Sequence, residues 1–386
     1  MKGNISILLT ILFLSVACNF QGKKTYTEDN EASMLPPLDS GVVYYQFDTL
    51  FHLTGEKILN DSLIHKFSRI FVKDNQLIFY GFEWDFNKHL PKHKFCYFSL
   101  PAIRFLKYEE DYLPNFEVII STPDTTLLCY LWSKYDQRLY KYDLSGKIEA
   151  MDAKIPFKRQ DIISSVTHIG NEDFIYLKDT SIIRTTIAKD TVIEKKLYDL
   201  TMRPGLGSLV INVSKNRMAF AYRYYQLIHI MDLEAKTVKT IDFKNGNHHY
   251  EHNKRTCMDC VDRSIRYYCD AFAGDDYFYV LYWGHSYLEL FNHVGKGWRW
   301  AGREKRYVKT EHYQQNLPNI VEQYDWNGNP VARYLLEGDP VRRGEGHFFV
   351  DEKEQRFYIV ASECYATFMA TLMCGESLIA YSYKQN

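Results

Sequence analysis

The sequence predicts an all-β protein, built as a six-bladed β-propeller of four-stranded antiparallel blades. Six times, a short polar turn precedes a dense apolar and aromatic run, which is typical of a β-hairpin. A second hairpin follows each of the first five runs, so one repeat supplies four strands. Aromatic residues make up 16% of the chain, and they favour pleated, half-buried surfaces.

The six runs recur at the spacing of propeller blades. Successive runs are separated by 50, 47, 44, 59 and 80 residues. Blade repeats are about 40 to 50 residues long, so the last two intervals indicate blades with insertions. The positions compared are Leu77, Leu127, Phe174, Met218, Tyr277 and Phe357. A two-domain array of β-sandwiches is the alternative, but no Pro- or Gly-rich linker interrupts the repeat.

The sixth repeat predicts how the ring closes. It ends with the run 378–383 and is one strand short. Residues 42–47, ahead of the first repeat, supply a spare apolar strand. Pairing this N-terminal strand with the C-terminal blade would remove an exposed sheet edge.

The N-terminus predicts export. Lys2 precedes an apolar run at 5–14, and small residues then lead into Cys18. This is a secretory signal, too short to span a bilayer. The cysteine directly after Val-Ala resembles a bacterial lipobox, which implies that Cys18 is lipidated; an ordinary cleaved signal peptide is the alternative. The expected division is residues 1–17 as signal peptide, 18–40 as lipidated cysteine and flexible tether, and 41–386 as propeller.

This division predicts a location and excludes one class of partner. We expect an exported, membrane-anchored lipoprotein of the outer membrane, facing the periplasm or the cell surface. The chain has 47 Lys and Arg residues against 48 Asp and Glu residues, so it has no overall field to attract nucleic acid. We expect a monomer that meets the membrane through its lipid.

Signal, lipobox and repeats together resemble a known group. The segments VSKNRMAFAY and EQYDWNGNPVARYLLEGD are strand-and-turn motifs of this kind. They resemble those of bacterial lipoproteins with a TolB-like six-bladed propeller, over nearly all of the body. A neighbouring group of uncharacterised lipoproteins is a comparable match. The resemblance brings no catalytic residues to carry over.

The insertions predict a working face. In an antiparallel set of four strands, the connection from second to third strand and the linker between sets leave at one end of the sheet. All long segments fall at that end, and function concentrates on loops carried by a rigid scaffold. We call this end the insertion-rich face; its segments are 81–94, 244–266, 283–319, 338–346 and 361–376.

Two of these insertions hold candidate ligand-binding residues. Aromatic rings interleaved with arginines can stack on sugars or bind anionic groups. The alternative is a hairpin flap whose tryptophans pack on the propeller and whose charges are solvated. The candidates are His285, Trp298, Arg299, Trp300, Arg303, Arg306, Arg342 and Arg343.

Another insertion holds the soft ligands of a possible metal site. His248, His252, Cys257 and Cys260 have the residue types of a tetrahedral zinc site, but a single Cys-x-x-Cys supplies only half of one. We expect no cofactor, with zinc or calcium as the alternative. In an exported protein the thiols are also candidates for disulfides. These candidates are Cys257, Cys260, Cys269, Cys364 and Cys374, of which the last two share one insertion.

The sequence contains no nucleophile elbow, zinc-protease helix, phosphate loop or dinucleotide fingerprint. We therefore expect a binding or scaffold module that holds an envelope protein or a glycan through its insertion-rich face, and not an enzyme. The alternative is a propeller hydrolase or lyase acting on a carbohydrate or a small ester, with a site spread over several blades.

Overall fold

The structure is a computed structural model. It describes residues 51–61, 67–73, 75–85, 87–88, 90–100, 102–111, 116–120, 128–133, 138–143, 148–154, 163–170, 173–188, 191–200, 207–242, 266–285, 298–301, 306–309, 319–337, 347–366 and 372–384. All of its regular elements in these ranges are β-strands, so the all-β prediction is confirmed.

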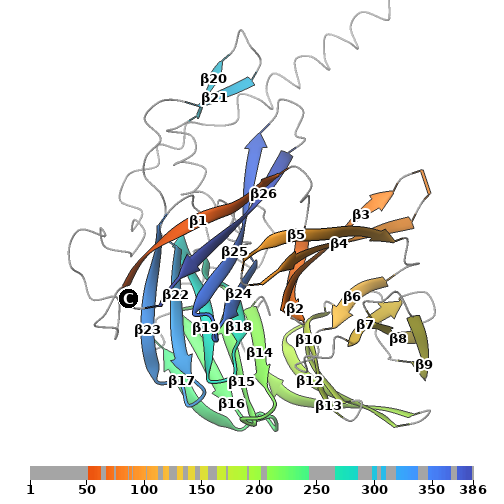
Figure 1. The fold of residues 1–386 in the computed structure, drawn as a ribbon. Helices are drawn as coiled ribbons and strands as arrows, with labels where there is room; N and C mark the ends of the chain where they lie inside the picture. Colours follow the sequence, from red (N-terminus) through yellow and green to blue (C-terminus); the bar gives the residue numbers. More distant parts are fainter. Residues whose placement is uncertain are drawn as a thin grey trace, which may run out of the picture. The chain divides into compact units, whose positions relative to one another are not determined.

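Four separate four-stranded antiparallel sheets form from consecutive strands (Figure 1). The first two are β2 (Phe67–Lys73), β3 (Gln76–Asp85), β4 (Leu90–Ser99) and β5 (Arg104–Asp111), then β6 (Phe116–Ile120), β7 (Leu128–Ser133), β8 (Arg138–Asp143) and β9 (Ile148–Lys154). The next two are β10 (Ile163–Gly170), β11 (Asp173–Lys178), β12 (Ser181–Ala188) and β13 (Thr191–Asp199), then β14 (Gly207–Asn212), β15 (Arg217–Tyr222), β16 (Leu227–Met231) and β17 (Thr237–Asp242).

The remaining large sheet has eight strands but consists of two antiparallel sets of four. One set is β18 (Arg266–Ala273), β19 (Tyr277–His285), β22 (Asn319–Asp325) and β23 (Pro330–Glu337). The other is β24 (His347–Asp351), β25 (Arg356–Ala366), β26 (Leu372–Ser382) and β1 (Phe51–Asp61). A parallel pairing of β1 with β23 joins the two sets. A small separate hairpin is formed by β20 (Trp298–Ala301) and β21 (Arg306–Lys309).

An N-terminal strand does complete the last set, but it is not the strand expected. β1 pairs antiparallel with β26, from Gly55 opposite Tyr381 to Asp61 opposite Glu376. The segment 42–47 lies outside the described residues. The sequence pattern does not predict a strand over 51–61, because Gly55 and Glu56 interrupt the apolar residues there.

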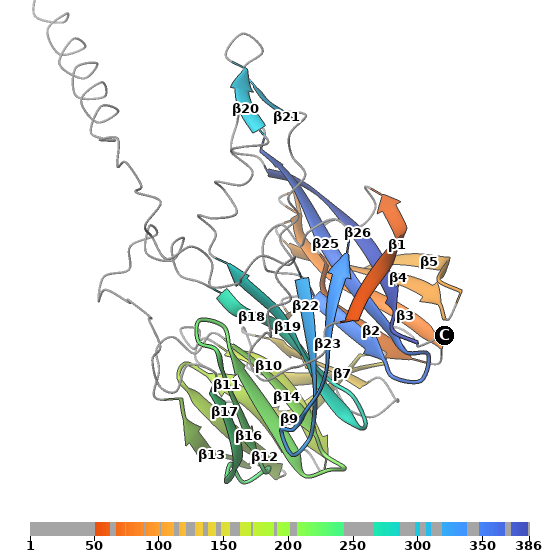
Figure 2. The same ribbon diagram turned by 90° about the vertical axis from the view of Figure 1, so that its left-hand side faces the viewer.

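The first strands of successive sets contact one another. β10 contacts β6 and β14, β18 contacts β14 and β24, and β24 contacts β2. All described residues belong to one compact unit, Val43–Asn386, in which the sheets follow one another in this order (Figures 1 and 2).

The apolar runs of the sequence lie on the second strands of the sets, and the run on β11 is buried on both faces. Phe174–Leu177 are at most 1% exposed, which continuous apolar runs achieve only when both faces are covered. The covering comes from neighbouring sheets. Phe79 and Phe98, for example, share one apolar cluster with Tyr358 and Leu378 of the next set. The core is therefore a series of sheet-to-sheet interfaces.

Candidate functional site

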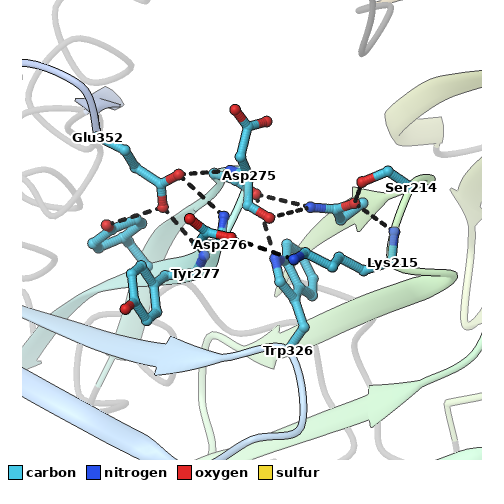
Figure 3. Close-up of polar contacts among 10 residues, drawn as sticks. Ser214, Lys215, Asp275, Asp276, Tyr277, Trp326 and Glu352 are labelled. Atoms are coloured by element: carbon cyan, nitrogen blue, oxygen red, sulfur yellow. Dashed lines mark hydrogen bonds and ion pairs between the residues drawn. The ribbon is translucent and has the colours of Figure 1, made fainter.

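The short turn between β18 and β19, residues 274–276, is held by three different connections (Figure 3). The Asn212 side chain, at the end of β14, donates to the carbonyls of Gly274 and Asp275 at 3.0 Å each. The Trp326 indole N–H donates to the same Gly274 carbonyl at 3.3 Å. A neighbouring sheet and another turn of the same set therefore both hold this turn, which gives it a rigidity that a three-residue loop lacks by itself.

Glu352, in the turn between β24 and β25, makes the third connection. Its Oε2 accepts hydrogen bonds from the backbone N–H groups of Asp275 at 2.7 Å and Asp276 at 3.2 Å. Its Oε1 accepts from the Tyr277 N–H at 3.2 Å and the Tyr279 hydroxyl at 3.1 Å. A carboxylate that accepts several charge-assisted hydrogen bonds is held firmly in place.

Gly274 makes room for this carboxylate. A Cβ built at Gly274 would overlap the Glu352 carboxylate atoms. No side chain larger than hydrogen fits there while Glu352 keeps its place. The glycine and the glutamate therefore form one packing unit across two sets of strands.

A cavity of about 410 Å³ opens beside this turn. This volume lies in the range of small-molecule sites, about 300 to 1,000 Å³. Four tyrosines, two glutamines and two carboxylates line it, and no lysine or arginine is among the described residues of its wall. They are Asp276, Tyr277, Tyr279, Gln323, Tyr334, Glu352, Gln355 and Tyr383. We call this the tyrosine pocket.

A chain of hydrogen bonds orders the floor of the tyrosine pocket. The Tyr334 hydroxyl donates to the Gln323 carbonyl oxygen at 2.9 Å, and the Gln323 amide donates to the Tyr279 hydroxyl at 3.3 Å. The Tyr279 hydroxyl in turn donates to Glu352 and lies 3.5 Å from the Tyr383 hydroxyl. Tyr279 is fully buried and Gln323 is 5% exposed, so this network is fixed before any ligand arrives.

The phenols of Tyr279, Tyr334 and Tyr383 stay protonated at neutral pH. Burial, followed by the Tyr383 hydroxyl and the Glu352 charge, raises the pKa of Tyr279 far above its ordinary value. Burial also raises the pKa of Tyr334, and it raises the pKa of Tyr383 to about 12. These groups are hydrogen-bond donors and acceptors there, and none is a tyrosinate base.

One cation stands near the rim. The Lys215 ammonium, from the turn after β14, lies 3.3 Å from the Asp276 carboxylate, whose side chain is 71% exposed. Such an exposed pair is screened by water and adds little stability. The Glu352 carboxylate and most of the Asp276 charge therefore leave the pocket electronegative.

The tyrosine pocket lies at the opposite end of the strands from the insertion-rich face. The turns at 274–276, 326–329 and 352–355 join first to second or third to fourth strands. In antiparallel sets these turns share one end, and the long connections leave at the other. The insertion-rich face stays a prediction, since most of its residues lie outside the described ranges.

The structure brings some of the predicted ligand residues together. Trp298, Arg299 and Trp300 form β20, and Arg306 begins β21, so these four belong to one two-stranded hairpin. His285 ends β19. Arg303, Arg342 and Arg343 lie outside the described residues.

The remaining predicted sites are placed only in part. Cys18 and the metal candidates His248, His252, Cys257 and Cys260 lie outside the described residues. Cys269 is on β18, where its buried thiol packs in the apolar cluster between the two sets of the eight-stranded sheet. Cys364 and Cys374 lie directly opposite each other on β25 and β26.

The sequence pattern does not single out the residues of the tyrosine pocket. In that pattern, 274–276 and 351–353 are short polar turns that precede apolar runs. One feature of the sequence could have pointed to these residues: both turns contain acidic side chains, and they belong to consecutive repeats. Only the pairing of neighbouring sets shows that Glu352 meets the other turn.

The described residues contain no group of three or more His, Cys, Asp or Glu side chains arranged to hold a metal ion. In the same ranges, no helix has the length and apolarity needed to cross a membrane.

No protein-family model matches the chain, and no curated protein matches it. A solved member of the DUF4221 family from Bacteroides vulgatus is similar, with 11% identity and a TM-score of 0.51, over 86% of this chain and 97% of that one. The calcium-binding protein regucalcin from Agrobacterium tumefaciens has 12% identity and a TM-score of 0.46, over 87% and 97%. Virginiamycin B lyase from Staphylococcus aureus has 9% identity and a TM-score of 0.41, over 85% and 99%. These neighbours are propeller-like, and the first likeness shows that this chain has a β-propeller type of fold.

Proposed function

We propose that this protein is a six-bladed propeller that acts as a binding module for a hydroxyl-rich ligand, such as a sugar unit of a glycan. The observation that carries the proposal is the wall of the tyrosine pocket, made of phenols, amides and carboxylates around about 410 Å³. Phenol rings offer flat apolar faces, while amides and carboxylates bind hydroxyl groups.

The charge of the tyrosine pocket narrows the ligand class. Glu352 and Asp276 line it, and Lys215, which pairs with Asp276, is not part of its wall. An anionic ligand would meet two carboxylates in a wall that has no described lysine or arginine, which costs binding free energy. We therefore expect neutral sugars and amino sugars to bind and sugar phosphates to fail.

The protonation of these phenols speaks against their use as general bases. A general base must lose its proton near the working pH, and the raised pKa values of Tyr279, Tyr334 and Tyr383 oppose this. No observation on the described residues favours the hydrolase or lyase, so we propose no reaction.

The pairing of strands supports the proposal of six blades. The four separate sheets and the two halves of the eight-stranded sheet supply six antiparallel sets of four. Contacts between their first strands run from β6 through β24 to β2, as they would around a propeller axis. The parallel β1–β23 pairing then joins the outermost strands of the last two blades.

The location belongs to the same proposal and rests on the sequence. The signal and the cysteine at position 18 support export and lipid anchoring in the bacterial envelope, where the propeller would meet glycans. A protein partner bound at the insertion-rich face stays a prediction. A Cys18→Ser variant should stay unlabelled by a fatty-acid probe that labels the wild type.

Calorimetric titration with three kinds of sugar tests the binding proposal. The probes are a set of neutral mono- and disaccharides, glucosamine, and glucose 6-phosphate. We expect at least one neutral or cationic sugar to bind at least about tenfold more tightly than glucose 6-phosphate, which equals about 1.4 kcal/mol. Preferred binding of the sugar phosphate would contradict the proposal.

A further inference from the structure

We propose that Cys364 and Cys374 form a cross-strand disulfide that staples the projecting end of the β25–β26 hairpin. The inference rests on backbone register and does not depend on the tyrosine pocket or its ligand.

The register of β25 and β26 is continuous through the two cysteines. It begins with Arg356 opposite Ser382 and runs without a shift to Ala366 opposite Leu372. Buried residues fix it at the base, because Phe357 is fully buried and its partner Tyr381 is 3% exposed. A slip by one residue would turn these side chains to the other face of the sheet.

This register places Cys364 directly opposite Cys374. Directly opposite residues of an antiparallel pair share one face, with Cα atoms about 4.5 or 5.5 Å apart. Disulfides join residues whose Cα atoms are about 4.4 to 6.8 Å apart. The Cα spacing of either type of antiparallel pair lies within this range.

The hairpin also extends beyond the strands that flank it (Figure 1). On one side, β24 pairs with β25 only as far as Val360. On the other side, β1 pairs with β26 only between Glu376 and Tyr381. The pairs from Glu363 opposite Gly375 to Ala366 opposite Leu372 therefore form a two-stranded ribbon without a third strand among the described residues.

A two-stranded ribbon is marginally stable in water. A covalent link across it removes open conformations from the competing ensemble, so the ribbon stays paired. The two cysteines lie within this ribbon, one pair from its base, so a link between them joins the part that no third described strand supports.

The bond forms by two thiol–disulfide exchanges with a disulfide donor. The thiolate of one cysteine attacks the donor disulfide, forms a mixed disulfide and releases one donor thiolate. The second cysteine thiolate attacks the first cysteine's sulfur and releases the other donor thiolate. The protein loses two electrons and two protons, and the donor gains the electrons as two thiols.

Peptide mapping tests the bond directly, because trypsin has no site within 357–383 and releases both cysteines in one peptide, 357–384. The purified full chain is equilibrated with glutathione and glutathione disulfide, denatured without reductant, alkylated and digested. We expect this peptide without alkyl groups and lighter by two hydrogen atoms than its reduced form. Cleavage after Met369 and Met373 should then leave the two cysteine fragments joined until they are reduced.

A register variant is the matched control. In the double variant Cys374→Ser/Met373→Cys, the new thiol stands opposite Tyr365, on the other face of the ribbon. We expect both of its thiols to be alkylated at a glutathione ratio that oxidises the wild type. On reduction, amide exchange in 363–366 should accelerate about tenfold or more in the wild type and stay unchanged in this variant.

Two results would overturn the inference. One is alkylation of both Cys364 and Cys374 in the wild type even with glutathione disulfide alone as the redox partner. The other is a link from either cysteine to a different cysteine of the chain.

Discussion

The Tyr279 hydroxyl donates a 3.1 Å hydrogen bond to Glu352, although 73 residues separate the two along the chain. The two residues belong to different antiparallel sets, so this bond ties one set to the next beside the tyrosine pocket. Since Glu352 also accepts three backbone N–H groups, the pocket and the turn at 274–276 share one supporting carboxylate.

Replacing this carboxylate should destabilise the protein. In Glu352→Gln, one of the two carboxylate oxygens becomes an NH₂ group that faces N–H or O–H donors. We expect a loss of about 1 to 3 kcal/mol in the free energy of unfolding, measured by urea denaturation.

Glu354→Gln is the matched control for this variant, because Glu354 lies in the same turn but is exposed. It should change the free energy of unfolding by less than about 0.5 kcal/mol. Equal effects of the two substitutions would mean that Glu352 does not hold the turn.

Gly274→Ala should act through Glu352. The added methyl group would displace the carboxylate, so its effect should resemble the loss of the glutamate side chain. We expect each of Gly274→Ala and Glu352→Ala to cost about 1 to 3 kcal/mol, with the double variant costing clearly less than their sum. Additive losses in a double-mutant cycle would show that the two residues act independently.

Buried phenols should make the protein sensitive to alkali. Above pH of about 10 the unfolded chain loses phenol protons that Tyr279 and Tyr334 keep in the fold, because their folded pKa values are raised. The stability from these groups is therefore present below pH 10 and lost as pH rises above it. Each contributes a slope of up to about 1.4 kcal/mol per pH unit.

Tyr334→Phe isolates one such phenol. Between pH 10 and 12, its free energy of unfolding should fall less steeply with pH than that of the wild type. Parallel pH profiles for the two proteins would contradict burial of this hydroxyl.

The sequence was sufficient to predict the strands whose buried residues form a continuous apolar run. Phe174–Leu177 is a run of four apolar residues, and the structure covers both of its faces. The strand β1 is not predictable from its own residues, because Gly55, Glu56 and Lys57 are typical of a loop. Its pairing partners lie far away in the sequence, near residues 334 and 380. Pairing between strands so far apart in the sequence depends on how the sheets close, so it leaves no pattern in the residues of β1 itself.

The same reason explains the candidate site. Its members come from turns and strand ends far apart in the chain, and each is an ordinary turn acid, glutamine or tyrosine by itself. The sequence pointed instead to long insertions, which are visible as breaks in the repeat. Only the packing of the two neighbouring sets of the eight-stranded sheet brings Glu352 to Gly274 and Tyr383 to Tyr279.

The most direct test of the tyrosine pocket compares ligand affinity in two pocket variants and one control. Tyr277→Phe and Tyr383→Phe each remove one hydroxyl from the wall and keep the ring, whereas Tyr198→Phe makes the same change on β13, in another sheet. For the neutral or amino sugar that binds the wild type best, calorimetry should give a Kd raised about three- to tenfold by each pocket variant, the value of one hydrogen bond. Tyr198→Phe should leave Kd unchanged. Unchanged affinity in both pocket variants, with the fold intact, would contradict the account.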